Sequence, residues 1–365
     1  MNYVKYRFHV ILVGLLVLLG LICCQTSEKY TSDPTTVYFE HQDFNRITTL
    51  DKFSLVDFTV PEKPMLFHII HDTIMLVRNW TGDPFFLELY DIRNKKKLTS
   101  FLRRGRGPGE WLSAGLTVKS NLYNYITVFD IHRRVAANFY IDSILEYGDL
   151  YQPKIFNVPD FAGNDIAFLQ ENDAIIFNKY HINDKMFSNK TTKSLFHFSL
   201  LGDQRNEFIA EKERHKNFTL NVSGGYIAQS PGFDKIFVFY QFENRIDLYD
   251  QELRLTTVFL GPKENELEYY FRDMGYNHVS FKYGVNAFSN IYYTSDNIYA
   301  VYNGWGKSSS HIMKISWEGA LLDYFIIPDE FNMHIRSIYV DEKSGILYGS
   351  VSDNDAYPEI VKFNI

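Results

Sequence analysis

The stretch Phe86-Leu-Glu-Leu-Tyr-Asp91, followed after a polar tip by Leu98-Thr-Ser-Phe101, decides the fold. A short apolar run that ends at an acidic residue and is followed by a second apolar run predicts two antiparallel β-strands joined by a turn. Close copies occur at Tyr125–Asp130 and at Asn244–Asp250, and the second is followed by Leu255–Phe259. The chain is therefore expected to contain several similar hairpin units.

Weaker copies of this unit extend the series to six. They surround residues 196–202, 312–319 and 359–363. The equivalent turn positions are spaced about 54 residues apart, which is typical of propeller blades with loop insertions; these positions are Asp91, Asp130, Ser199, Asp250, Ser316 and Phe363. No long segment carries a helical stripe. The sequence predicts an all-β fold, a six-bladed β-propeller.

A second marker supports the repeat. Gly107-Pro-Gly-Glu110 follows the first hairpin and Gly261-Pro-Lys-Glu264 follows the fourth. A blade cannot be stable alone because neighbouring blades cover both of its faces, so the ring must close.

Closure is predicted to use the N-terminal part of the chain. The last unit supplies three strands, at 334–340, 346–351 and 359–363, and lacks the fourth. An N-terminal strand is expected to close the last blade from the outside, with Thr36–His41 or Phe53–Val60 as the candidates, which would remove exposed sheet edges.

The first 25 residues predict export. Lys5 and Arg7 precede an apolar run of thirteen residues, Val10–Ile22. That run suits a secretory signal and is shorter than the roughly 18 to 20 residues of a membrane-spanning helix. The ending Leu21-Ile-Cys-Cys-Gln25 resembles the lipobox of bacterial lipoproteins and predicts Cys24 as the lipidated N-terminus. An ordinary cleaved signal without lipid is the alternative.

These patterns divide the chain into three parts. Residues 1–23 form a lipoprotein signal peptide, residues 24–35 form a flexible tether that begins at the lipidated Cys24, and residues 36–365 form the propeller. The tether is assigned because it carries no apolar pattern.

Charge and cysteine content limit the partners. Removal of the signal changes the count of basic against acidic residues from 37 and 44 to 35 and 44, a net charge of −9. An acidic protein is a poor partner for nucleic acid or anionic lipid headgroups, so we expect contact with the membrane through the acyl chains alone. No cysteine follows Cys24, and the exported domain must be stable without disulfides.

The lipobox, the six units and the segment Phe101-Leu-Arg-Arg-Gly-Arg-Gly-Pro-Gly-Glu110 together resemble the TolB-like six-bladed β-propeller lipoproteins of Gram-negative envelopes. The resemblance implies a lipid-anchored protein of the bacterial cell envelope. Gln25 after the lipidated cysteine favours the outer membrane. The family has no common activity, so the resemblance assigns no catalytic residue.

The glycine-rich segment allows two interpretations. Gly105, Gly107, Pro108, Gly109 and Glu110 are expected to form a structural loop, since glycine and proline select unusual backbone angles. The three arginines of the segment could bind an anionic ligand through paired hydrogen bonds; these are Arg103, Arg104 and Arg106. The alternative, which we prefer, is that they pair with Glu88, Glu110 or backbone carbonyls.

Further ligand-binding candidates come from the expected innermost strands, because propeller ligands usually bind where the central channel opens. The strands are predicted at 64–70, 114–119, 165–169, 225–229, 285–289 and 334–340. Their polar members are His68, Lys119, Asp165, Gln229, Asn286, His334 and Arg336. His68 and Arg336 join the three arginines as candidate ligand-binding residues.

The sequence offers little evidence of catalysis. The histidines lack metal-binding spacings, and no Gly-x-Ser-x-Gly nucleophile motif occurs. We therefore predict no catalytic, metal-binding or cofactor-binding residue and no cofactor. The preferred function is a non-catalytic binding module for a peptide, glycan or protein partner at the channel face. The alternatives are a metal-assisted hydrolase or lyase with its site in the channel, and a structural subunit of an envelope assembly, for which an apolar surface patch would be the sign.

Overall fold

The computed structural model describes residues 33–57, 64–71, 73–79, 84–117, 124–130, 132–158, 162–170, 173–178, 191–199, 207–213, 225–241, 243–262, 269–273, 277–281, 287–303, 309–351 and 359–365. The chain divides into two compact units, Met1–Pro34 and Thr35–Ile365, and the second contains every described element.

Among the described residues of the second unit, strands predominate and form six sheets of four or five strands, numbered in chain order. Sheet 1 contains β4 (Pro64–His71), β5 (Ile74–Asn79), β6 (Phe85–Asp91) and β7 (Lys96–Arg103). Sheet 2 contains β8 (Gly115–Thr117), β9 (Tyr125–Asp130), β10 (Val135–Tyr140) and β11 (Ile155–Asn157). Sheet 3 contains β12 (Ala162–Gln170), β13 (Asp173–Asn178), β14 (Thr191–Ser199) and β15 (Glu207–Glu213).

The second half of the chain continues the series. Sheet 4 contains β16 (Gly225–Gln229), β17 (Lys235–Tyr240), β18 (Arg245–Asp250), β19 (Leu255–Leu260) and β1 (Thr35–Tyr38). Sheet 5 contains β22 (Phe288–Tyr293), β23 (Asn297–Tyr302), β24 (His311–Ser316), β25 (Leu321–Ile326) and β2 (Arg46–Thr49). Sheet 6 contains β26 (Ile335–Asp341), β27 (Ile346–Val351), β28 (Glu359–Asn364) and β3 (Ser54–Leu55). A separate hairpin pairs β20 (Tyr269–Asp273) with β21 (Asn277–Phe281).

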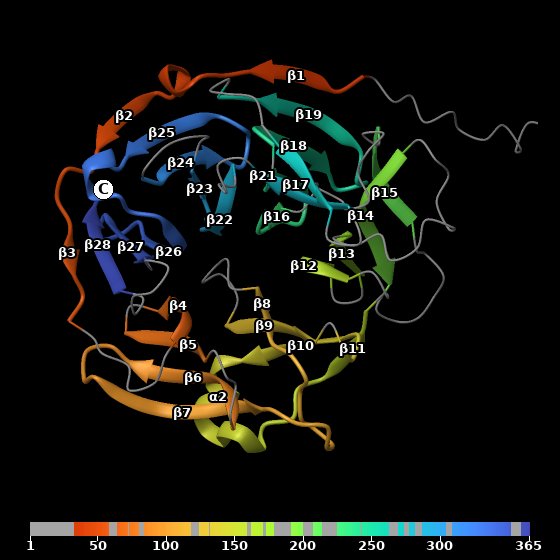
Figure 1. Ribbon diagram of the computed structural model, residues 1–365, viewed down its shortest axis with the longest axis vertical. Helices are drawn as coiled ribbons and strands as arrows, with labels where there is room; N and C mark the ends of the chain where they lie inside the picture. Colours follow the sequence, from red (N-terminus) through yellow and green to blue (C-terminus); the bar gives the residue numbers. More distant parts are fainter. Residues whose placement is uncertain are drawn as a thin grey trace, which may run out of the picture. The chain divides into compact units, whose positions relative to one another are not determined.

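The sheets are arranged around a common centre, and the fold is an all-β propeller (Figure 1). The first strand of each sheet lies nearest the centre. Innermost strands of neighbouring sheets contact one another in the pairs β8 and β12, β12 and β16, β16 and β22, β22 and β26, and β26 and β4. All six predicted innermost strands overlap observed ones, which are β4, β8, β12, β16, β22 and β26. Local alternation and turn residues were sufficient to locate them.

Buried side chains fill the boundaries between neighbouring sheets. One apolar cluster joins sheets 1 and 2 through residues such as Leu76, Leu89 and Val128, and another joins sheets 4 and 5 around Phe239 and Phe288. Each sheet therefore needs its neighbours to cover its faces, as expected for a propeller.

The N-terminal segment runs along the outside of three successive sheets (Figure 1). β1 pairs in parallel with β19, β2 pairs in parallel with β25, and β3 pairs antiparallel with β28. We call residues 35–57 the N-terminal belt. The prediction that an N-terminal strand closes the last sheet is confirmed by β3, which lies in the candidate 53–60. The other candidate, 36–41, instead adds a fifth strand to sheet 4.

Two sequence assignments need correction. Asp130 ends β9, the second strand of its sheet, whereas Asp91 and Asp250 end third strands. The two strand types share the same apolar run and acidic turn residue, so sequence alone misplaced this one. The prediction of uniform four-stranded units also missed the fifth strands of sheets 4 and 5.

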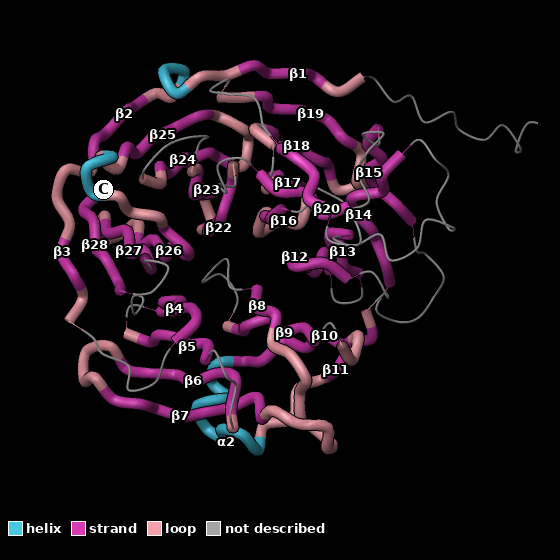
Figure 2. Tube along the Cα trace, viewed as in Figure 1, coloured by secondary structure: helices cyan, strands magenta, loops and turns pink. Residues whose placement is uncertain are grey.

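Helix is scarce in the part of the chain that the structure describes (Figure 2). α2 (Ile141–Tyr147) follows β10 and buries Ile141 and Ile144. The short 3-10 helices are η1 (His41–Asp43), η2 (Gly148–Leu150) and η3 (Asp329–Phe331). No described helix is long and apolar enough to cross a bilayer.

Candidate functional site

The glycine-rich segment forms a tight turn between β7 and β8. The amide of Glu110 donates to the carbonyl of Gly107 (3.2 Å), and Gly109 has a φ of 75°. With Pro108 in the second position, this is the pattern of a type II turn. The side chain of Glu110 folds back to accept the Gly107 amide (2.7 Å). A side chain at Gly105 would overlap that carboxylate. The motif thus builds a loop around its own glutamate.

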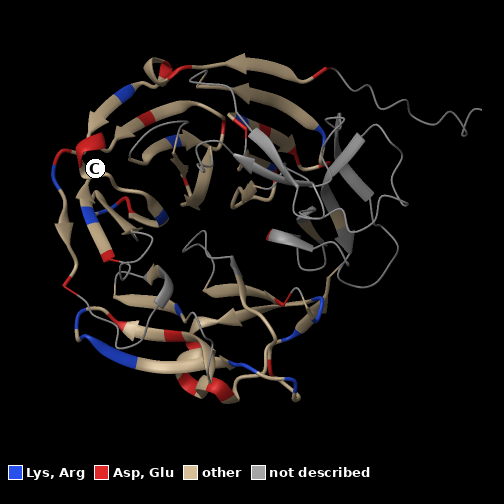
Figure 3. Cartoon of the chain, in the orientation of Figure 1, with Lys and Arg blue, Asp and Glu red and all other residues tan. Residues whose placement is uncertain are grey.

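The arginines of this segment leave the outermost strand of sheet 1. Arg103 donates to Asp149 (3.0 Å) and lies over the Phe85 ring, with 4.9 Å from its guanidinium carbon to the ring centroid. Arg104 lies over the Phe86 ring in the same way at 5.9 Å. Arg106 is exposed. Figure 3 shows basic residues on β7 and on the segment that follows it.

Arg103 has a partner other than the two carboxylates expected from the sequence. Glu88 is buried and accepts hydrogen bonds from Tyr90 (2.7 Å), Ser100 (3.2 Å) and Lys97. Burial alone would raise the pKa of Glu88, but the hydrogen bonds from Lys97 and Tyr90 outweigh it and hold the pKa below its usual value. The side chain of Glu110 accepts a hydrogen bond from the Gly107 amide within its own loop. Arg103 forms an ion pair with Asp149, which belongs to η2.

A second buried acid repeats the arrangement of Glu88. Asp247 on β18 accepts from Tyr240 (2.8 Å) and from two nitrogens of Arg245 (2.6 and 3.0 Å). Tyr249 follows it by two residues, as Tyr90 follows Glu88, and also donates to it (3.4 Å). The repeated acid-Leu-Tyr-Asp sequence thus encodes a buried hydrogen-bond network inside the sheet, which serves stability.

Several candidates on the innermost strands are also structural. Asp165 on β12 is buried and accepts the amide of Ile227 on β16 (2.6 Å), which connects sheets 3 and 4. Gln229 is buried as well. His334 is half-buried. Lys119, Asn286 and the proposed lipidation residue Cys24 lie outside the described residues.

Arg336 differs from these because it is exposed although it belongs to an innermost strand. The register of β26 against β27 shifts between Ile335 and Ser337, so Arg336 lies at a bulge. Bulges turn a side chain away from the regular direction of the strand. Arg336 therefore reaches solvent from the central side of sheet 6.

His68 does not line an open funnel, contrary to expectation. It is 7% exposed, and its Nε2 has no hydrogen-bond partner. Burial, aided by the positive charge of Arg78, lowers the pKa of His68 to about 4. The imidazole is therefore neutral near pH 7. Its position opposite Leu76 on β5 directs it toward the boundary between sheets 1 and 2, where Leu76 packs.

Arg78 is a residue that sequence reasoning missed. It lies on β5 and is half-buried, and burial is the sole cause that lowers its pKa. Within the part of the chain that the structure describes, the guanidinium makes no hydrogen bond or ion pair. The available signal was an arginine directly after the apolar run Ile74–Val77, a placement that normally requires a partner.

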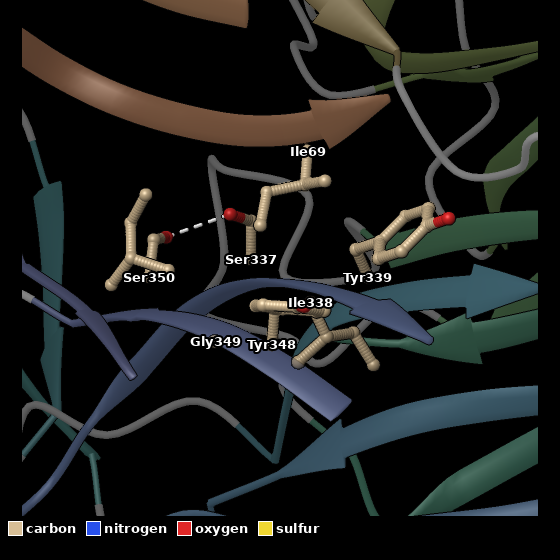
Figure 4. A pocket seen from close by; sticks show the side chains of 8 residues that line it. Ile69, Ser337, Ile338, Tyr339, Tyr348, Gly349 and Ser350 are labelled. Atoms are coloured by element: carbon tan, nitrogen blue, oxygen red, sulfur yellow. Dashed lines mark hydrogen bonds between the residues drawn. The ribbon is translucent and has the colours of Figure 1, made fainter. Parts of the chain in front are cut away.

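A small cavity lies between sheets 6 and 1 (Figure 4). Ile69, Ile338, Tyr339 and Ile360 contribute to a mainly apolar lining, together with Ser337 and Ser350, whose hydroxyls are 2.7 Å apart. Its volume matches about one water molecule. It is too small for a ligand of the predicted kind.

The described residues contain no group of three or more His, Cys, Asp or Glu side chains placed to hold a metal ion.

Comparisons with known proteins agree with the fold. An exported protein of Bacteroides fragilis superimposes with a TM-score of 0.53 at 11% identity, covering 91% of this chain and 99% of that one. A member of the DUF4221 family from Bacteroides vulgatus superimposes with a TM-score of 0.48 at 9% identity, covering 86% and 94%. No protein-family model and no curated protein matches the chain. At these identities the first likeness supports the propeller fold alone.

Proposed function

We propose that this protein is a lipid-anchored component of the bacterial cell envelope whose propeller is a non-catalytic binding module. The anchor would be the acylated Cys24, followed by the short tether. The lipobox-like ending of the apolar run supports the anchor, and the Bacteroides fragilis protein of similar fold is described as exported. The outer membrane is the proposed destination.

The proposal includes six blades of a TolB-like type. Each of the six sheets of four or five strands would be one blade, with β20 and β21 as an insertion between the fourth and the fifth. The sequence segment Gly105–Glu110 and its turn support the assignment.

The observation that carries the binding role is the exposure of Arg336 on an innermost strand. A charged side chain that reaches solvent from the central side of a ring is placed to meet a ligand at the channel. The outer arginines fit this role less well, because Arg103 is paired with Asp149 and Arg104 packs on Phe86.

An array of envelope glycans and peptides tests the binding role with purified full-length protein in detergent. We expect at least one class of ligand to be retained, and we expect Arg336→Ala to weaken retention about tenfold, in line with the loss of a charge-assisted hydrogen bond. The triple change of Arg103, Arg104 and Arg106 to Ala is the matched control and should leave retention unchanged. No retention by the wild-type protein, or equal retention by Arg336→Ala, would contradict the proposal.

Lipidation is tested separately by labelling cells with radioactive palmitate. The wild-type protein should take up label and fractionate with the outer membrane. Cys24→Ala should abolish labelling, whereas Cys23→Ala should retain it. Label that persists in Cys24→Ala would show that the anchor has been misplaced.

A second candidate function has an observation in its favour. Four large apolar side chains are exposed along the segment from the end of β10 through α2 and η2, which contacts β7; they are Tyr140, Leu145, Tyr147 and Leu150. Apolar patches of this kind mark protein interaction surfaces. A role as a subunit of an envelope assembly would appear as a cross-linked complex in intact envelopes that Leu150→Glu abolishes.

A further inference from the structure

His68 and Arg78 lie on the same face of sheet 1. His68 pairs with Leu76 and Leu66 pairs with Arg78, with no register shift between these pairs. Directly opposed residues of an antiparallel ladder share a face, and so do residues two apart on a strand. The two side chains are thus diagonal neighbours, with β-carbons about 7 Å apart by strand geometry.

This face is turned toward sheet 2. Leu76 lies between His68 and Arg78 in the ladder and packs in the cluster that also contains Trp111, Val128 and Ala137. Trp111 directly follows the glycine-rich turn. The pair therefore lies at the boundary of sheets 1 and 2.

Arg78 differs from Arg245, the other half-buried arginine among the described residues, because Arg78 has no partner in the described structure. Arg245 is held by both oxygens of Asp247, and those contacts raise its pKa despite burial. Nothing in the described structure compensates Arg78 in this way. A half-buried guanidinium without a counter-charge is costly, and buried polar atoms without partners, such as Nε2 of His68, are uncommon in native proteins.

We propose that Arg78 and His68 form a binding site for a carboxylate group of the ligand, which rests on the proposed binding function. The guanidinium of Arg78 binds the two carboxylate oxygens with a pair of parallel hydrogen bonds. Nε2 of His68 makes a further hydrogen bond to the same ligand. The ligand thereby supplies the charge and the partner that the protein itself does not.

Charge favours a carboxylate over a phosphate. The site offers one positive charge, because the imidazole is neutral near pH 7. One guanidinium balances a monoanion, and its planar fork fits a carboxylate in two-point contact. A phosphate with nearly two negative charges would remain undercompensated in a protein that is already acidic.

Thermal unfolding of the full-length protein in detergent, in a buffer free of phosphate and carboxylate, tests the site. The probes are D-glucuronate, D-glucose as its neutral counterpart, trialanine with a free carboxylate, trialanine amide, and inorganic phosphate. At about twentyfold excess over Kd, a bound probe should raise the unfolding midpoint by about 2 to 3 °C for a domain of this size. Glucuronate or trialanine should do so, and the arm that responds identifies a sugar acid or a peptide terminus as the source.

Matched variants locate the effect. Arg78→Gln should abolish the shift and Arg78→Lys should reduce it, because lysine keeps the charge and loses the fork. Arg106→Gln, an exposed arginine on the outer loop, should shift as wild type does. An equal shift in Arg78→Gln would overturn the site. A shift with phosphate as large as with the carboxylates, or none with either carboxylate, would overturn the ligand class.

A second measurement observes His68 in the wild-type protein itself. In the wild-type protein, the imidazole nitrogen signals of His68, assigned by NMR through their loss in His68→Gln, should move on addition of the active carboxylate and stay in place with glucose. Signals that do not move would overturn the site. The array of glycans and peptides distinguishes failure of this site from failure of the binding function. Retention that depends on Arg336 and not on Arg78 would overturn the carboxylate site and leave the binding function intact. No retention by the wild-type protein would overturn the binding function itself.

Discussion

At the scale of single residues, the buried polar groups divide into satisfied and unsatisfied ones. Asp247 and Glu88 are surrounded by donors, and Asp165 accepts a backbone amide from the next sheet. His68 and Arg78 lie among apolar neighbours without comparable partners in the described structure. The first group contributes to stability, and the second group is the basis of the proposed carboxylate site.

The lowered pKa of His68 predicts a specific pH dependence. The folded protein resists protonation down to about pH 4, whereas an unfolded histidine takes up a proton near pH 6.5. Stability contributed by the neutral imidazole is therefore complete above pH 6.5 and is lost as the pH falls toward 4. Between pH 7 and pH 4.5 the free energy of unfolding of the wild-type protein should fall by about 2 kcal/mol more than that of His68→Gln.

Urea unfolding of both proteins at the two pH values measures this difference, and the carboxylates that also titrate in this range cancel in the comparison. Parallel losses in the two proteins would show that His68 is not a buried neutral group.

The glycine-rich turn predicts an energetic coupling. Gly105→Ala should lower the free energy of unfolding by about 1 kcal/mol, because the new methyl group displaces the Glu110 carboxylate from the Gly107 amide. In a Glu110→Ala background the same change should cost almost nothing. Gly109→Ala is the control, since its cost arises from the positive φ and should persist in both backgrounds. A double-mutant cycle by chemical denaturation measures the coupling, and additive effects of Gly105 and Glu110 would refute the explanation.

At the scale of elements, the sequence predicted the inner part of each sheet better than the outer part. Residues 225–229 were predicted as an innermost strand and form β16 with the same bounds, because alternation and flanking turns are local signals. β1 and β2 were missed as fifth strands. Their residues are mostly exposed, so neither strand carries the apolar pattern that reveals a buried strand, and pairing with β19 and β25 depends on distant parts of the chain.

Arg78 shows which part of the candidate site the sequence could not predict. The sequence analysis did not single out its strand, and the lack of a partner is a property of the folded neighbourhood. The sequence placed His68 correctly on an innermost strand but not its environment, because the side chain is buried at the boundary between sheets 1 and 2 and does not line an open funnel.

A few buried side chains hold the N-terminal belt against the sheets. Substitutions at buried and at exposed positions of the belt should therefore lower the stability of the protein by different amounts. Phe44 is 4% exposed and contacts Phe39 and Tyr324, with ring centroids 6.1 and 5.2 Å apart. Phe44→Ala should cost about 3 to 4 kcal/mol. Tyr38→Ala on the same belt should lower the free energy of unfolding by less than about 1 kcal/mol, since Tyr38 is 65% exposed. Urea unfolding gives both values, and similar costs would mean that the belt is not anchored through Phe44.

At the scale of the whole molecule, the belt covers the outer edges of three sheets and closes the last one. The antiparallel pairing of β3 with β28 is short, but it is reinforced by the amide of Val56, which donates to Ile360 (2.8 Å). Leu50, which is 3% exposed, packs into the cluster shared by sheets 5, 6 and 1. The first segment of the propeller thus connects to its last sheet, as a closed ring requires.

Removal of the belt should therefore affect the entire ring. A chain that lacks residues 35–57 would expose the edges of β19, β25 and β28 and should self-associate, because free strand edges pair with other chains. Size-exclusion chromatography with light scattering on the detergent-solubilised protein measures the mass. A monodisperse, monomeric product with an unchanged unfolding midpoint would show that closure does not depend on the belt.

The central functional claim is that Arg78 and His68 await a partner from the ligand. A crystal structure of the full-length protein grown with D-glucuronate or trialanine, whichever raises the unfolding midpoint, tests it most directly. The carboxylate should lie within about 3 Å of the Arg78 guanidinium nitrogens, with a ligand atom at hydrogen-bond distance from Nε2 of His68. An Arg78 that is instead paired with an acidic side chain of the protein, with the ligand elsewhere, would contradict the claim.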